Sequence, residues 1–507
     1  MFLAWDVAAA CLAAAAAILV IKKRNDALLR LPPGPQPEIL FGNARQLPSS
    51  RSWEVYTKWK QIYGDVVYAR VFGRSVVILN SITAARDLLE QKGRTFLDRP
   101  SFHAFHMMGW GHTLQVLPHG PRLKKYRRIM HQYLGPQGLM AIRPMQEHEI
   151  RKFLRRLLDE PDNFKRHIHN FIAGIVLSIV YGHEVVSDDD ALARLIERAV
   201  HKTGEFGNFG TTFFDIFPFL RYVPAWFPGM KARRVINEIR ELVDSVITEP
   251  LKELKQLRAL GTVKPCMLSD LLDNHDEMDV SDLEHEQDIM NIGLSIYSGE
   301  HQCFTKSLLI GFFLLMTLHP EVAKKAQQDI DQVTGKDRLP TPDDRKHLPY
   351  IDCILKELYR LLPPNPIGVP HTSMEVEHYR DWILPEGTMA LPNIWIMMQD
   401  PTVFPNPSAF LPERHMEKVK ANLKQTKSNK IANDDTEDIA FVAADDPSTL
   451  VFGFGRRGCP GRYFADANLW LAVANILAMF DTKPYTNTVT GTVELPKLEL
   501  ENQGALA

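Results

Sequence analysis

Apolar residues recur with the spacing of one helix face through most of the chain, so the sequence predicts a mainly helical protein. Helices are predicted over residues 51–63 and 81–91, and long helical segments over residues 140–260. Two shorter apolar runs, at 66–71 and 76–79, are rich in β-branched residues and flank a glycine-containing turn. This pattern predicts a pair of strands within the helical protein.

The N-terminus carries a continuous apolar stretch, residues 7–21, which residues 2–5 extend past the single Asp6 and which is followed directly by Lys22, Lys23 and Arg24. A helix of about 20 residues spans a bilayer. The basic cluster follows the apolar stretch instead of preceding it, which favours an uncleaved anchor over a cleaved signal peptide or a buried helix. The positive-inside rule then places the rest of the chain in the cytosol.

A basic and proline-rich stretch, residues 25–36, comes next. Its consecutive prolines cannot continue a helix and form a stiff connector. The sequence therefore predicts three parts: a membrane anchor at 1–24, a linker at 25–36 and one large folded domain at 37–507.

Three irregular segments interrupt the helical pattern. Residues 206–228 combine many aromatics with Gly and Pro, so they do not form a regular helix. Core packing would explain these aromatics, but an exposed patch that dips into a membrane agrees better with the anchor. Residues 101–118 are predicted as an apolar loop over a pocket, because no carboxylate or cysteine joins their histidines as a metal ligand. Residues 417–448 are predicted as a polar solvent loop.

Composition and charge narrow the class of protein. The 507 residues suffice for one large domain or about three average ones, and the net charge of -2 gives no indication of nucleic-acid binding. The cysteines are few, scattered and odd in number, which argues against a disulfide framework or a zinc site and for a reducing compartment. They are Cys11, Cys266, Cys303, Cys353 and Cys459.

A glycine-rich decapeptide, residues 452–461, carries the strongest chemical signal. An apolar run precedes it and a helical period follows it, which predicts a strand end, a tight loop and a helix start. Cys459 lies near the start of that helix, where backbone N–H groups favour a thiolate. Arg456 and Arg457 can pair with carboxylates. A lone cysteine is usually an inert buried residue. A cysteine in a glycine-rich loop with arginines beside it, however, suits an axial thiolate ligand of haem iron.

The full pattern Phe-x-x-Gly-x-Arg-x-Cys-x-Gly resembles the cysteine-ligand signature of the cytochrome P450 family. The resemblance implies that Cys459 is the axial ligand of the haem iron, that Arg457 contacts a haem propionate, and that Phe452 packs against the haem near the cysteine.

A second motif supports the resemblance. Glu357 and Arg360 share one face of a predicted helix, which by itself is a common surface ion pair. The sequence Pro-Glu-Arg-His at 412–415 follows, and it resembles the family's Pro-Glu-Arg-Phe element with His415 in place of the aromatic. The resemblance implies a buried triad of Glu357, Arg360 and Arg414 that orders the loop before the cysteine. Breaking such a triad leaves a buried charge without its partner.

Two further basic residues match positions that contact the propionates in the family. Arg127 keeps the arginine of the family's Trp-x-x-x-Arg helix, while Leu123 stands where tryptophan is typical. His371 follows a proline-rich extended segment, as the family's propionate-binding histidine does. The other cations of residues 119–134 form either a docking face for an acidic reductase or an ordinary solvated face.

The chain departs from the family in the long apolar helix predicted from Glu284 to Leu318. This helix typically carries an acid–alcohol pair that relays protons, and no Asp/Glu-Thr pair occurs here in either possible register. Glu300, His301 and Thr305 are nearby groups that could substitute as proton donors. Glu300 and His301 could equally face away, because helix neighbours point about 100° apart.

The resemblance spans nearly the whole chain and implies a mainly α protein of the cytochrome P450 fold, a helical triangular prism with small β-sheets, preceded by an N-terminal transmembrane helix. It implies a haem-thiolate catalytic domain that inserts one oxygen atom from O2 into a small apolar substrate, in the manner of fungal secondary-metabolite enzymes. The cofactor would be haem b. Electrons would come from NADPH through a separate NADPH–cytochrome P450 reductase, because no dinucleotide fingerprint occurs.

The resemblance also implies a single-pass protein of the endoplasmic reticulum membrane with its catalytic domain in the cytosol and no nucleic-acid partner. Two alternatives remain open from the sequence. One is a haem-thiolate isomerase or dehydratase that needs no reductase, which the missing acid–alcohol pair motivates. The other is a haem-binding protein without turnover.

Overall fold

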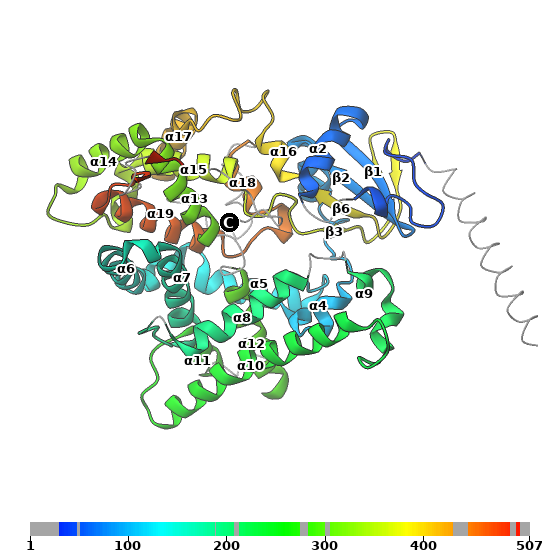
Figure 1. Cartoon of the computed structure of the whole chain (residues 1–507), viewed down its shortest axis with the longest axis horizontal. Helices are drawn as coiled ribbons and strands as arrows, with labels where there is room; N and C mark the ends of the chain where they lie inside the picture. The colour runs from blue at the N-terminus through cyan, green and yellow to red at the C-terminus, as the bar shows by residue number, and fades with distance from the viewer. Residues whose placement is uncertain are drawn as a thin grey trace, which may run out of the picture.

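Helices dominate the molecule, and a four-stranded sheet lies to one side of them (Figure 1). The computed structural model describes residues 30–47, 51–187, 189–206, 212–273, 282–299, 305–428, 445–486 and 493–496. The longer helices are α2 (Ser52–Tyr63), α5 (Pro121–Leu134), α6 (Pro136–Asp159), α7 (Phe164–Tyr181), α8 (Ala191–Phe206), α10 (Lys231–Ala259), α12 (Asp282–Gly299), α13 (Thr305–Leu318), α14 (Pro320–Thr334), α15 (Pro349–Leu361), α17 (Met416–Ser428) and α19 (Arg462–Met479). The shorter helices are α3 (Ile82–Arg86), α4 (His103–Met107), α9 (Phe213–Ile216), α11 (Met267–Asp273), α16 (Ile394–Met398) and α18 (Pro447–Val451).

The predicted strand pair is confirmed. Residues 66–71 and 74–79 form an antiparallel hairpin, in which Phe72 and Gly73 both take positive φ values of 48° and 80° at the turn. Consecutive positive φ values match the right-handed twist of a hairpin. Two more strands from the second half of the chain extend this sheet in the order β1-β2-β6-β3. The strands are β1 (Val66–Val71), β2 (Arg74–Leu79), β3 (His371–Thr372), β4 (Glu377–Tyr379), β5 (Trp382–Leu384), β6 (Met389–Pro392), β7 (Tyr485–Thr486) and β8 (Val493–Glu494). Two further sheets of two strands each, β4-β5 and β7-β8, are found among the described residues.

Helix α19 lies at the centre of the helical half and packs against α6, α13, α14 and α15. Consecutive residues from Asn468 to Leu477 are buried, so the helix contacts protein on all sides. A helix that is apolar all round is stable only inside a core. The loop that carries Cys459 precedes α19 directly, and the core therefore fixes one end of that loop.

Several predictions from the sequence pattern hold. The chain is helical over Ser52–Tyr63 and from Ile82 to Gln91, and long helices occupy most of residues 136–259. The aromatic-rich segment is irregular where it is described, with only the short helix α9 and a 3-10 turn at Pro218–Tyr222. The helix predicted from Glu284 to Leu318 is described as α12 and α13, with residues 300–304 outside the described part.

Two predictions about the approach to the cysteine loop are wrong. The apolar run before the loop is the short helix α18 and not a strand, because Asp446 caps the helix N-terminus and Pro447 occupies its first turn. The polar stretch after 416 is not all loop, because α17 continues to Ser428. For α18, a capped helix start outweighed the local apolar pattern.

The predicted anchor at 1–24 and residues 25–29 of the linker lie outside the described residues. Among the residues that are described, no individual helix combines the length and apolar composition needed to cross a membrane. Helices α13 and α14 meet that criterion only when taken together, and they are bent by 104° where they join.

Candidate functional site

The cysteine loop is a tight turn that closes on its own backbone. Gly453 and Gly455 have φ values of 82° and 53°, and a Cβ on Gly455 would lie 2.4 Å from the Leu89 carbonyl oxygen. Only glycine fits such a position. The Cys459 N–H donates to the Phe452 carbonyl at 2.7 Å. The loop is therefore held in one shape before the Cys459 side chain makes any contact.

The Cys459 side chain is exposed, although Arg457 and Gly458 next to it are buried. Helix α19 begins at Arg462, so Cys459 lies just before a helix N-terminus. Partial positive charge at such an end favours a thiolate. Arg127 of α5 donates from Nη1 to the Gly458 carbonyl at 2.8 Å and so supports the loop from a second helix. The Cys459 thiol therefore lies on a rigid loop, next to the positive charge of Arg127 and of the N-terminus of α19.

Arg457 points into the protein and is not fully satisfied there. Its Nε donates to the Leu97 carbonyl at 2.6 Å, but Nη1 and Nη2 are buried and have no hydrogen-bond partner among the described residues. The nearest carboxylate oxygen, Oδ1 of Asp98, lies 3.9 Å from Nη2. Burial, with the Arg127 charge adding to it, lowers the pKa of Arg457 to about 10.

Two more basic side chains share this region. Arg99 donates from Nη1 to the Val369 and Pro370 carbonyls at 2.9 and 2.8 Å. Burial first, and then the nearby Arg457 and Arg127 charges, lower the pKa of Arg99 to about 9. His371 begins β3, and its Nδ1 donates to the Phe96 carbonyl at 3.0 Å. Burial and Arg99 keep the pKa of His371 well below its usual value, so the ring is neutral.

This cluster of buried cations fits an anionic ligand. Burying charged N–H groups without partners is costly, and a carboxylate is the partner that an arginine fork matches best. Haem carries two propionate carboxylates and takes a cysteine thiolate as an axial ligand in one class of haem protein. The residues that are present therefore fit haem on both counts: a thiol on a rigid loop, and buried guanidinium groups with N–H donors to spare.

Sequence reasoning missed Arg99. The residue lies in an ordinary-looking stretch between Asp98 and Pro100 and belongs to no motif. Its position beside Arg457 and its hydrogen bonds to the Val369 and Pro370 carbonyls identify it. Phe452, which the sequence predicted beside the haem, is buried and makes an edge contact with the Tyr359 ring at 5.8 Å between centroids.

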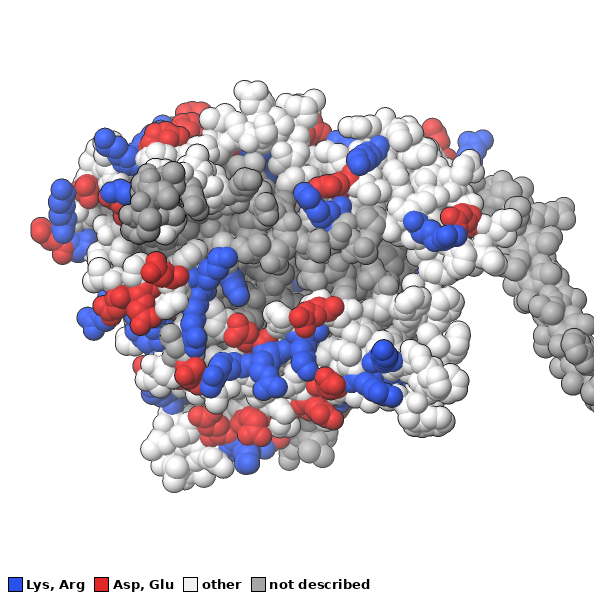
Figure 2. Space-filling model, in the orientation of Figure 1, with Lys and Arg blue, Asp and Glu red and all other residues white. Residues whose placement is uncertain are grey.

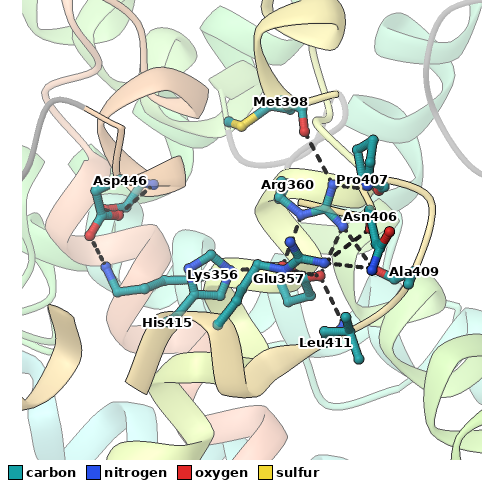
Figure 3. Close-up of polar contacts among 12 residues, drawn as sticks. Lys356, Glu357, Arg360, Met398, Asn406, Pro407, Ala409, Leu411, His415 and Asp446 are labelled. Carbon is teal, nitrogen blue, oxygen red and sulfur yellow. Dashed lines mark hydrogen bonds and ion pairs between the residues drawn. The ribbon is translucent and has the colours of Figure 1, made fainter. Parts of the chain in front are cut away.

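The structure brings Glu357, Arg360 and Arg414 together in a buried network (Figure 3). Glu357 Oε1 accepts from Arg360 Nη2 at 2.8 Å, from the Leu411 N–H at 3.0 Å and from Arg414 Nε at 3.1 Å. Its Oε2 accepts from Arg360 Nε at 2.9 Å and from His415 Nε2 at 2.7 Å. Burial alone would raise the pKa of Glu357, but the hydrogen bonds from His415 and Arg360 lower it to about 2.

The network orders the chain that precedes the cysteine loop. Arg360 also donates to the carbonyls of Met398, Pro407 and Ala409, at 3.1, 2.7 and 3.0 Å. Arg414 donates to the Pro405 carbonyl at 2.6 Å. The two guanidinium groups thereby hold an irregular segment that has few other backbone partners. His415, which sequence reasoning treated only as a replaced aromatic, is a direct member of the network.

The distal residues are described only in part. Thr305 is the first residue of α13 and is buried. Glu300 and His301 lie outside the described residues, so their predicted part in proton delivery stays a prediction.

The chain is similar to a family of known proteins. The sequence model of the family described as cytochrome P450 matches residues 32–501. Cytochrome P450 monooxygenase 208 of Postia placenta is 35% identical over 98% of this chain and 94% of its own length. Cytochrome P450 monooxygenase claR of Ampulloclitocybe clavipes is 35% identical, with 97% and 89% covered. Cytochrome P450 monooxygenase ppsD of Aspergillus oryzae is 32% identical, with 94% and 86% covered. The chain therefore belongs to the cytochrome P450 family and is an enzyme of its monooxygenase type.

Proposed function

We propose that this enzyme inserts one oxygen atom from O2 into a small apolar organic substrate, with Cys459 as the axial thiolate of haem b. Bound haem supplies the iron centre at which O2 is activated. The observation that carries the proposal is the pairing of an exposed Cys459 on a rigid loop with the buried N–H donors of Arg457. Thiolate donation in such a site favours O–O cleavage.

The propionates are assigned to the buried cation cluster. Arg457 and Arg99 provide N–H donors and positive charge. His371 is the third proposed propionate contact; its Nδ1–H is already used on the Phe96 carbonyl, so the ring donates to a propionate from Nε2 only when it is protonated. Arg127, also predicted as a propionate ligand, donates from Nη1 to the Gly458 carbonyl, and the described part of the chain offers its other N–H groups no further hydrogen bond. Phe452 packs beside the haem.

Electrons are proposed to come from NADPH through a separate NADPH–cytochrome P450 reductase. Lys124 and Arg128 on α5 and Arg456 on the cysteine loop are exposed cations, and α5 contacts the loop through Arg127. Arg122 and Lys125 are engaged instead with Asp288 of α12, at 2.9 and 2.7 Å. The exposed cations suit an acidic partner, because complementary charge speeds association.

The proposed location is the endoplasmic reticulum membrane, with residues 1–24 as the anchor and the catalytic domain in the cytosol. Large apolar side chains gather on and after α9: Phe213, Phe219, Tyr222, Trp226 and Phe227 are 51–75% exposed. The surface over α9 is largely without charge in Figure 2, whereas charges of both signs cover α10. An exposed apolar patch of this kind suits a membrane surface. A substrate from fungal secondary metabolism is proposed as well, and the relatives named above come from fungi.

A reconstitution with reductase tests the proposed reaction. Substrate-dependent NADPH consumption and an oxygenated product are expected, and both should disappear without reductase. Comparing metabolites of the parent organism before and after deletion of the gene supplies the substrate candidates.

A haem-thiolate isomerase or dehydratase is the second candidate, because the segment from Gly299 to Thr305 lacks the acid–alcohol pair. Product formation without NADPH and reductase would favour it. For the monooxygenase, Glu300, His301 and Thr305 are the proposed proton donors. Single substitutions that leave peroxide release unchanged at all three positions would contradict that assignment.

A further inference from the structure

Lys356 is the neighbour of Glu357 on α15, but it serves a different contact. Because successive residues on a helix point about 100° apart, Lys356 turns away from the Glu357 network. Figure 3 shows its side chain extending to Asp446, and Nζ donates to Asp446 Oδ2. The side chains are 13% and 1% exposed, so this is a buried ion pair.

The second carboxylate oxygen of Asp446 caps the N-terminus of α18. Oδ1 accepts from the Ser448 N–H at 2.9 Å and from the Ser448 hydroxyl at 2.6 Å. The Asp446 carbonyl accepts from the Thr449 N–H at 3.0 Å and from its hydroxyl at 2.8 Å. One carboxylate therefore caps a helix and binds a lysine of α15 at the same time.

Helix α18 has little stability of its own. It spans only Pro447–Val451, and a helix of that length depends on its cap and on tertiary contacts. It packs against α15 and α16. It leads directly into Phe452, whose carbonyl accepts the Cys459 N–H. Any shift of α18 therefore moves the hydrogen bond that holds Cys459.

We propose that Lys356 and Asp446 are positioning residues: through α18 they fix the position of the Cys459 thiolate. The inference rests on the proposed role of Cys459 as the iron ligand. Lys356 lies on a long helix packed in the core, whereas Asp446 begins a short one. When the ion pair is lost, we therefore expect α18 to shift and α15 to stay in place. The Glu357 network holds the segment before the loop, and the Lys356–Asp446 pair holds the helix that enters it.

Two substitutions separate the ion pair from the helix cap. Lys356→Met keeps the aliphatic stem and removes the charge. Asp446→Asn keeps an oxygen for the Ser448 N–H, because asparagine is as good a cap as aspartate, but it loses the charged partner. Lys152→Met is the matched control: Lys152 Nζ lies 3.0 Å from the buried Glu149 on α6, and the two side chains are 22% and 2% exposed.

In addition to thermal unfolding, two quantities are measured on the haem-loaded protein. The first is the fraction of the reduced carbon-monoxide complex that shows the thiolate-ligated Soret band. The second is the rate at which haem transfers to an excess of a haem acceptor. The first reports the cysteine–iron bond, the second reports how firmly the site as a whole holds haem, and neither needs turnover.

Lys356→Met and Asp446→Asn should each lower the thiolate-ligated fraction and speed haem transfer about tenfold, because a broken buried pair leaves a charge that only rearrangement relieves. The double variant should be no worse than either single one. Lys152→Met should lower thermal stability with an unchanged band. Variants of the pair that match wild type, or a control that loses the band equally, would overturn the inference. A wild-type protein with no thiolate band would instead refute the role of Cys459.

Discussion

Glu357 is the residue on which most of the order before the cysteine loop depends. Arg360, Arg414, His415 and a backbone N–H all donate to its carboxylate, and Arg360 and Glu357 are fully buried. Removing one member of a buried ionic network costs about 3–5 kcal/mol, because the remaining charge is left without a partner. The usual aromatic at position 415 could not donate in this way, so the chain has exchanged an apolar contact for a hydrogen bond.

The hydrogen bond between His415 and Glu357 predicts that the stability of the folded protein depends on pH. His415 contacts Glu357 and lies near Lys356 and Asp446, and burial lowers its pKa. The ring is neutral in both states above its unfolded pKa of about 6.5. Below that value the unfolded state takes up a proton that the folded state resists, so the folded state loses stability.

His415→Gln keeps a donor to Glu357 and removes this titration. Melting temperatures measured from pH 7.5 to 5 should fall less steeply for the variant than for wild type. Buried His371 titrates in the same direction, so the slope should decrease without vanishing. Equal slopes for both proteins would exclude His415 as a source of acid sensitivity.

Arg457 supplies a second prediction at this scale. Its two buried terminal nitrogens have no hydrogen-bond partner among the described residues, so we expect them to bind a propionate. Hydrogen bonds to charged groups contribute about 1.5–3 kcal/mol each, so Arg457→Leu should speed haem loss at least about tenfold. Arg456→Leu, at the exposed neighbouring position, is the control and should leave the rate unchanged.

Single residues were predictable where chemistry fixes both type and spacing. Cys459, Arg457, Glu357 and Arg360 belong to motifs whose hydrogen bonds or metal bond admit few other side chains. Arg99 and the bond from His415 to Glu357 were not predictable, because they depend on segments that meet only in the folded chain. Burial of charge, which no single-sequence pattern reports, is what identifies them.

Among the secondary-structure elements, helix capping determined the conformation of α18, for which the local apolar pattern predicted a strand. The apolar run at 449–452 has the composition of a strand end, yet Asp446 and Pro447 start a helix there. Long helices and the first hairpin were predictable because their apolar period extends over many residues. The later strands β3 and β6 contain only two and four residues, too few for a period to appear.

The segment after α9 carries the element-scale prediction. Trp226 and Phe227 are 75% and 51% exposed, and together they offer apolar area to a bilayer surface. In a chain that begins at residue 30, the double change Trp226→Ser and Phe227→Ser should lower partitioning onto lipid vesicles at least about tenfold, since each buried aromatic contributes about 1.5–3 kcal/mol.

The control for that experiment is Leu158→Ser. Leu158 is 65% exposed on α6, which lies on the opposite side of the molecule from α9 in Figure 1. The control should partition as the unchanged chain does. Equal loss in both variants would show that general surface hydrophobicity, and not this patch, governs the binding.

Across the whole molecule, segments far apart in sequence converge on one site. Cys459 precedes α19, its support comes from α5, the cations come from residues 99 and 457, and neutral His371 comes from β3. The order of motifs along the chain was enough to predict the family and its mainly helical fold. The mutual placement of α5, α15, α18 and β3 around the cysteine loop required the structure, because packing of distant elements determines it.

The reduced carbon-monoxide difference spectrum shows whether Cys459 is the thiolate ligand of the haem iron. Wild-type protein should show the band of a thiolate-ligated haem. Cys459→Ser should lose that band, whereas Cys353→Ser, a change at a buried cysteine of α15, should keep it. A wild-type spectrum without the thiolate band, or a Cys459→Ser protein that retains it, would contradict the account.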